Sequence, residues 1–177
     1  MANERLYNPA TRFLLAYPEA FADWQNPTVA ELNANPDNDL TGKIFDITCA
    51  LNQDDTTFDL GDSETDDSLT FCQVAGNANP TSMNPDIVFG IERSRDPLED
   101  NTANVAFGLL AWKGVEYFAI LSVGEEPGTE FAERHRIKMA RVAVDHPVDL
   151  IGTGENIRLQ QTFAQRGDVL WNAILES

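Results

Sequence analysis

The residue types best suited to catalysis are few and widely spaced in this chain. The two histidines, His135 and His146, lie outside any HxxH or HExxH frame. The two cysteines, Cys49 and Cys72, form no CxxC motif and are too few for a disulfide framework, so we expect both in the core. There is no GxSxG elbow or P-loop, and no GxGxxG follows an expected strand. The sequence therefore predicts no enzymatic activity and no cofactor.

Carboxylates leave a cation site as the remaining chemical possibility. The segment Asp37-Asn-Asp39-Leu-Thr41-Gly42 resembles the start of an EF-hand loop. Its twelfth position is Thr48, where calcium requires a bidentate glutamate, and a strand instead of a helix is expected there. Acids elsewhere are abundant, but their spacing selects no acid–base pair. We therefore predict no dedicated metal site.

Charge placement is the most distinctive property of the sequence. The 177 residues carry a net charge of −17, and the span from Ile44 to Glu92 contains ten acids and no lysine or arginine. The segment 134–141, by contrast, is basic and has no acid. Such an acidic surface does not condense onto DNA or an anionic membrane, because phosphate binding needs clustered cations. No apolar run is long enough for a membrane span.

Two interpretations of this charge pattern remain open. One is an ordinary solvated acidic loop together with an ordinary basic strand face. The other is a contact between copies, in which the acidic loop of one subunit meets the basic face of the next, in a ring or filament. The candidate contact residues are Asp54, Asp55, Asp59, Asp62, Glu64, Asp66 and Asp67 on the acidic side, and Arg134, Arg136, Lys138 and Arg141 on the basic side.

Hydrophobic periodicity predicts mainly β structure. Alternation of apolar and polar residues indicates strands over 43–51, 69–74, 87–93, 116–124, 135–146, 156–165 and 169–175. One helix is expected before Gly114, with Val105, Leu109 and Trp112 on its apolar side and Asp100 or Thr102 as its cap. Residues 125–135 are typical of a turn with a short helical piece. The pattern favours an antiparallel β-sandwich or barrel with one flanking α-helix.

The domain organisation follows from the same pattern. Residues 1–40 are rich in proline and aromatic residues and are expected to form an extended N-terminal arm, docked on another subunit or packed on its own domain. Residues 41–177 are expected to form a single β-rich domain with a long acidic loop at 52–68.

The run from residue 47 to residue 96 resembles the major tail (tail-tube) proteins of long-tailed phages, particularly those that infect actinobacteria. The resemblance consists of a strand ending in CAL, a loop through FDLGDSETDDS, and TFC followed by a turn and a strand. The helix after RSRDPLEDN and the strand EYFAILSVG also fit. It extends over roughly residues 40–125, and the strands after that agree in type only.

The resemblance implies a non-enzymatic structural subunit of the virion tail, assembled in the host cytoplasm. Six copies close into a ring, and rings stack into a hollow tube that holds the tape-measure protein and later passes phage DNA. Tail terminator and tail-tip proteins are the further partners implied. The loop at 52–68 matches the segment that reaches the neighbouring ring in the family. The family's acidic lumen makes the strand residues Asp46 and Glu92 candidates for the channel wall.

Two alternatives have the same composition and strand pattern. One is another virion structural protein, such as a tail terminator or a head-decoration protein. The other is a β-sandwich module that binds calcium or carbohydrate.

Overall fold

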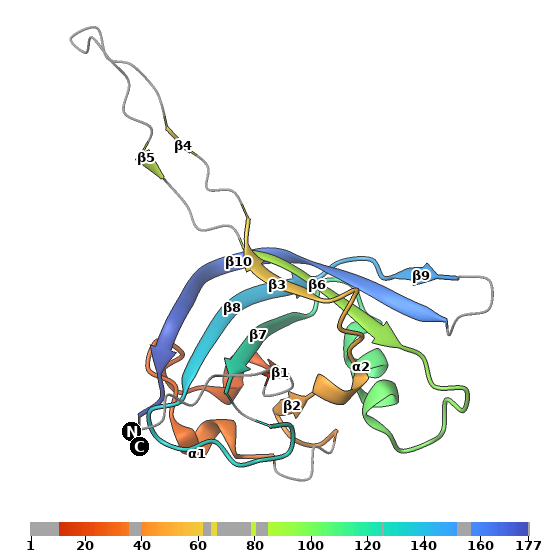
Figure 1. Cartoon of the computed structure of the whole chain (residues 1–177), viewed down its shortest axis with the longest axis horizontal. Coiled ribbons are helices and arrows are strands. Elements are labelled where there is room, and N and C mark those ends of the chain that lie inside the picture. The colour runs from red at the N-terminus through yellow and green to blue at the C-terminus, as the bar shows by residue number, and fades with distance from the viewer. Residues whose placement is uncertain are drawn as a thin grey trace, which may run out of the picture.

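A strongly curved antiparallel sheet forms the body of the protein (Figure 1). The structure is a computed structural model that describes residues 11–35, 40–61, 65–66, 79–80, 85–124, 126–151 and 157–176. The strands are β1 (Thr11–Ala16), β2 (Ile44–Asp46), β3 (Thr57–Leu60), β4 (Thr65–Asp66), β5 (Asn79–Pro80), β6 (Pro85–Glu92), β7 (Glu116–Val123), β8 (Arg136–Val144), β9 (Val148–Leu150) and β10 (Arg158–Ile174). The helices are α1 (Val29–Leu32) and α2 (Thr102–Leu110), with 3₁₀ turns η1 (Pro18–Ala20) and η2 (Thr48–Ala50).

Strand β10 joins the two halves of the sheet. The strand order is β2-β1-β7-β8-β10-β6-β3, and β9 pairs with β10 beside this path. Residues 158–162 of β10 pair with β6, whereas residues from 163 onward pair with β8. Register shifts after Gln165 and after Trp171 mark bulges, which bend a strand and increase its twist. The two strands expected over 156–165 and 169–175 are therefore one bent strand.

The main core lies between these two halves. It contains Phe45, Phe89 and Tyr117, and α2 adds Leu109 and Leu110. A second core covers the opposite face of β1, β7 and β8, beneath α1 and the segment around residue 131. Because successive strand residues point to opposite faces, burial on both faces makes these strands almost continuously apolar. The prediction of a mainly β, antiparallel fold with a flanking helix is confirmed.

Strand β1 places part of the predicted N-terminal arm inside the sheet. It pairs with β2 on one side and with β7 on the other, with Thr11 opposite Val123 and Ala16 opposite Phe118. Residues 11–35 are therefore packed on their own domain, the second of the two alternatives for this segment. Residues 1–10 lie outside the described part of the chain.

The strand predicted over 43–51 is shorter than expected. Asp46 Oδ1 accepts hydrogen bonds from the Thr48 amide at 3.1 Å and from the Thr48 hydroxyl at 2.6 Å. This local turn competes with strand pairing, so β2 ends at Asp46 and η2 follows. Cys49 is consequently exposed and not a core residue, which corrects the prediction. Cys72 lies outside the described residues.

Part of the predicted acidic loop belongs to the sheet. Its residues 57–60 form β3, which pairs with β6, and residues 65–66 form β4, which pairs with β5. The predicted strand over 69–74 lies outside the described residues. The expected helical piece within 125–135 is not present in residues 126–135, where turns occur at 127–128 and 133–134.

Helix α2 begins one residue away from either predicted cap. The side chain of Asn101 accepts a hydrogen bond from the Asn104 amide at 2.9 Å and caps the helix. Val105 and Leu109 are buried as expected, but Trp112 lies beyond the last helical residue and is 72% exposed. Gly114 then adopts a φ of 86°, which suits glycine and ends the segment.

A capping box fixes the short helix α1 against the second core. The Thr28 hydroxyl accepts a hydrogen bond from the Glu31 amide, while the Glu31 carboxylate accepts one from the Thr28 amide at 3.0 Å. Burial raises the pKa of Glu31, but hydrogen bonds from the Ala22 and Thr28 amides and the Thr28 hydroxyl outweigh burial. The pKa of Glu31 therefore lies below its ordinary value of 4.5.

We expect Glu31→Gln to lower the free energy of unfolding at pH 7 by roughly 0.5 to 1 kcal/mol, the range of a capping interaction. Because the folded pKa is lowered, this contribution is present above pH 4.5 and disappears as the pH falls through the folded pKa. Urea unfolding of both proteins at pH 7 and at a series of lower pH values measures the difference. A difference that stays constant across this series would contradict the assignment.

Candidate functional site

One face of the β3–β6–β10 half has no helix packed on it among the described residues, and most of its side chains are polar. Ile87, Phe89 and Ile91 of β6 point into the main core, so the alternate residues of this strand point outward. The helices α1 and α2 lie on the other side of the curved sheet (Figure 1). We call this surface the outward face; its members by register are Thr57, Asp59, Asp86, Val88, Gly90, Glu92, Arg158, Gln160 and Thr162.

Carboxylates dominate the charge of the outward face. Asp59 of β3 lies directly opposite Asp86 of β6, and both are exposed. Like charges directly opposite each other destabilise a strand pair. Glu92 lies opposite Arg158 at the other end of β6. The outward face therefore concentrates negative charge at a cost in stability.

The one arginine on the outward face is already paired within the subunit. Arg158 forms an ion pair with Asp55, and both side chains are mostly buried. Asp55 lies against Gly90, where an added Cβ would come within 2.3 Å of the Asp55 Cβ. Residue 90 must therefore be glycine for the chain after η2 to close over β6.

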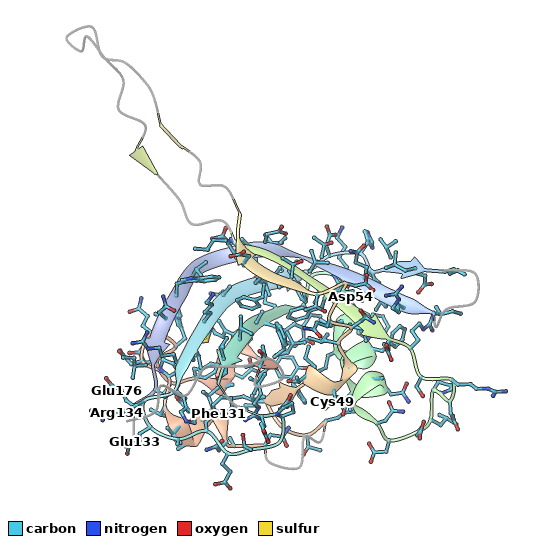
Figure 2. All side chains as sticks on the ribbon, viewed as in Figure 1. Cys49, Asp54, Phe131, Glu133, Arg134 and Glu176 are labelled. Atoms are coloured by element: carbon cyan, nitrogen blue, oxygen red, sulfur yellow. The ribbon has the colours of Figure 1, made fainter. Side chains whose placement is uncertain are left out.

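These contacts divide the predicted acidic contact residues into different groups. Asp55 is engaged within its own subunit, and Asp59 belongs to the outward face. Asp54 is exposed (Figure 2) and precedes β3. Asp66 lies in β4, and Asp62, Glu64 and Asp67 lie outside the described residues.

The predicted basic face is also divided. Arg136 and Lys138 lie on one side of β8, and Lys138 Nζ is 4.1 Å from the centre of the Trp171 ring. Arg141 lies on the opposite side, because it is an odd number of residues away, and its guanidinium contacts Glu116 at 2.6 Å. Arg134 is exposed and adopts a φ of 72° before the strand begins. The four cations therefore do not form one face.

Asp46 occupies a different environment from Glu92. Its carboxylate lies 2.8 Å from the Arg12 guanidinium, and the two side chains are 20% and 8% exposed. Arg12 also donates to the Thr129 carbonyl and lies 4.2 Å from the centre of the Phe131 ring. This cluster holds β1, β2 and the segment 129–131 together beside a cavity of about 280 Å³. The sequence pattern did not predict a role for Arg12, because this residue lies in the segment that was expected to form the N-terminal arm.

A family model for phage tail tube proteins matches the chain over residues 1–177. The chain belongs to the phage tail tube protein family. Comparison with curated proteins finds no match. Membership makes the protein a structural component of the phage tail, which assembles with itself and other tail proteins into a tube. This favours the tube subunit over the calcium- or carbohydrate-binding module, while the long-tailed type and the actinobacterial host stay predictions.

Three further observations describe this tail tube protein. Within the described ranges, no group of three or more His, Cys, Asp or Glu side chains is placed to hold a metal ion. None of the helices that the structure describes is long and apolar enough to cross a membrane. His135 contributes to local structure, since its Nδ1 accepts a hydrogen bond from the Ala132 amide at 3.1 Å.

Proposed function

We propose that six copies of this tail tube protein close into a ring, that rings stack into a hollow tube, and that the outward face lines the channel. The observation that carries the channel assignment is a sheet face that no described helix covers and that carries Asp59, Asp86 and Glu92. A channel wall has to stay exposed after assembly, and an uncovered polar face meets that requirement.

The chemistry of this face suits the passage of DNA. A polyanion is repelled by carboxylates and does not bind to a wall that lacks clustered cations. The positive charge of Arg158 is balanced by Asp55, so it offers little attraction to phosphate. The stability lost by opposing Asp59 and Asp86 then has a functional reason. Asp46, the other proposed wall residue, has its charge balanced by Arg12, so we now favour Glu92.

The remaining proposed roles are those that membership of the family implies. The tube, assembled in the host cytoplasm, would hold the tape-measure protein, end against the terminator and tail-tip proteins, and pass DNA without specific binding. We keep the acidic loop at 52–68 as the proposed contact between stacked rings. Among its described members, Asp54 is exposed and available for such a contact.

Reversal of the wall charges tests the channel assignment. We expect the triple variant Asp59→Lys, Asp86→Lys and Glu92→Lys to form tubes that retain double-stranded DNA at low salt, whereas wild-type tubes exclude it. The control variant changes Glu19, Glu126 and Glu130 to lysine, which alters the net charge equally at exposed positions off this face. Electron microscopy measures tube formation, and cosedimentation with a short DNA duplex measures retention.

The outcomes separate the two parts of the proposal. Equal DNA retention by the two triple variants would contradict the channel assignment. Failure of the wild-type protein to form rings or tubes at any concentration would contradict ring assembly itself.

A further inference from the structure

We propose that subunits join head to tail through Leu98, which docks on the end of β8 and β10 in a second copy of this chain. The inference rests on the proposed ring and names the surfaces that close it. The first surface is the Leu98 loop, residues 94–101, between β6 and α2. The second is the basic end, defined as Arg134, Arg136, Lys138, Trp171 and Ile174.

Leu98 is the most exposed large apolar side chain that the structure describes, at 92%. Its neighbours Asp96, Glu99 and Asp100 are acidic, with Arg95 as the opposing charge. An isolated apolar side chain surrounded by carboxylates resembles an interface anchor with a polar rim.

Hydrogen bonds hold the Leu98 loop in one conformation. The Leu98 amide donates to Asp96 Oδ1 at 2.9 Å. Asn104 of α2 donates its side-chain amide to the carbonyls of Asp96 and Glu99, at 2.8 Å and 2.7 Å. Asn101, the cap of α2, donates to the Glu99 carboxylate at 3.0 Å. The loop is therefore ordered before binding, which lowers the entropic cost of a contact.

The basic end offers the complementary chemistry. Ile174 is 54% exposed and lies opposite Arg136 in the register of β10 and β8. Asn172, with a φ of 67°, lies in the bulge before Ile174, and bulges re-aim the side chains that follow. Arg136 forms no ion pair with any other described residue. An exposed aliphatic side chain beside an exposed guanidinium matches a leucine beside carboxylates.

Two acids also lie at this end of the molecule. Figure 2 shows Glu133 and Glu176 close to Arg134, near the end of β10. The basic end contains three cations and these two acids lie beside it, so its total charge is only weakly positive. The charge complementarity of the proposed contact therefore comes from one ion pair, between Asp100 and Arg136, and not from the net charges of the two surfaces.

The placement of the two surfaces supports head-to-tail pairing. The Leu98 loop and the end of β10 lie at opposite ends of the long axis of the body (Figure 1). Each copy then presents both halves of the contact in opposite directions, which generates a closed ring or an extended array. A net charge of −17 opposes self-association, so a contact between copies needs local complementarity of this kind.

Two single-surface variants test the contact. Leu98→Asp alters the loop and leaves the basic end intact, whereas Ile174→Asp with Arg136→Glu alters the basic end and leaves the loop intact. We expect each variant alone to self-associate roughly 30-fold more weakly than wild type, the effect of losing an interface hot spot. A 1:1 mixture is expected to give a heterodimer and nothing larger, because only one intact pair of surfaces remains.

Analytical ultracentrifugation of each variant and of the mixture measures these species. Leu40→Asp is the matched control, since Leu40 is also exposed, at 65%, but lies away from both surfaces in sequence. It is expected to assemble like wild type, and urea unfolding verifies that every variant is folded. Asp100→Arg combined with Arg136→Asp in one chain is expected to restore part of the assembly lost by Arg136→Asp alone.

The results distinguish this contact from the proposed ring. Wild-type rings together with normal assembly of Leu98→Asp would overturn the contact and leave the ring proposal standing. A heterodimer from the mixture supports the contact even where the wild-type protein builds no ring. A mixture that contains only monomers, under conditions where wild type assembles, also overturns the contact.

Discussion

Replacing Phe89 with alanine is expected to lower the free energy of unfolding by about 4 kcal/mol, within the usual range for a buried phenylalanine. Phe89 is fully buried, and its ring meets Phe13 at 5.8 Å and Phe163 at 5.0 Å, both edge to face. These rings belong to β6, β1 and β10, so the substitution opens a cavity between the two halves of the sheet. Urea unfolding monitored by circular dichroism measures the loss.

Trp112→Ala is the matched control for Phe89→Ala. Both substitutions remove an aromatic side chain, but Trp112 is 72% exposed and follows α2. A surface substitution of this kind changes stability by no more than about 0.5 kcal/mol. Comparable losses in the two variants would mean that Phe89 does not anchor the main core.

Arg12→Met is expected to lower the free energy of unfolding by about 3 kcal/mol, because removal of one partner from a buried ion pair leaves an uncompensated charge. Arg12 Nε donates to Asp46 Oδ2 at 3.0 Å, and the guanidinium also stacks on Phe131. Methionine keeps most of the side-chain volume, so the loss reports on the charge and its hydrogen bonds. Urea unfolding of Arg12→Met, Asp46→Asn and the double variant gives the coupling energy.

Arg158→Met serves as the comparison for Arg12→Met. The Arg158–Asp55 pair is more exposed, at 21% and 23%, than Arg12 at 8%, so water compensates more of the remaining charge. We expect a loss of about 1 to 2 kcal/mol, between the values for exposed and for buried pairs. A larger loss from Arg158→Met than from Arg12→Met would contradict the assignment of Arg12 as the stronger tie.

Phe89→Ala and Arg12→Met are expected to lower the stability of the subunit without changing the proposed contacts between subunits. Phe89 lies beneath the outward face, between Val88 and Gly90 in β6, and Arg12 pins β1 to β2. Neither side chain reaches the proposed contact at Leu98 or the proposed channel wall. Both variants, examined well below their unfolding midpoints, are expected to exclude DNA as wild-type tubes do.

Local patterns were sufficient where one segment carries its own periodicity. Ile87, Phe89 and Ile91 are large apolar residues at every second position and are all buried, as predicted for one face of a strand. The helix was found from Val105 and Leu109, but Trp112 continues the pattern past the end of α2 and is exposed. Periodicity does not reveal where a helix stops, and the turn at residues 113–114 decides that end.

Other errors arose because partners were distant in the sequence. Thr11 pairs with Val123, and no local signal indicates that a short apolar run between two prolines enters the centre of a sheet. The end of β2 was more accessible to prediction, since an aspartate two residues before a threonine favours a local turn. The turn at Asp46 and Thr48 competes with the strand that the apolar alternation predicts up to residue 51, and in the structure the hydrogen bonds of the turn end the strand.

The class of the protein was predictable from its sequence: a β-rich chain with an acidic, cation-free segment and a resemblance to tail tube proteins, which the family match confirms. The distribution of its charges over the surface, by contrast, depends on the folded arrangement of the strands. Strand register set Asp59 opposite Asp86 and separated Arg141 from Arg136, because a shift of one residue moves a side chain to the other face. Folding likewise joined Asp46 to Arg12 and Asp55 to Arg158, and left Glu92 on the outward face. Register and long-range pairing depend on packing across the whole sheet, which no single segment encodes.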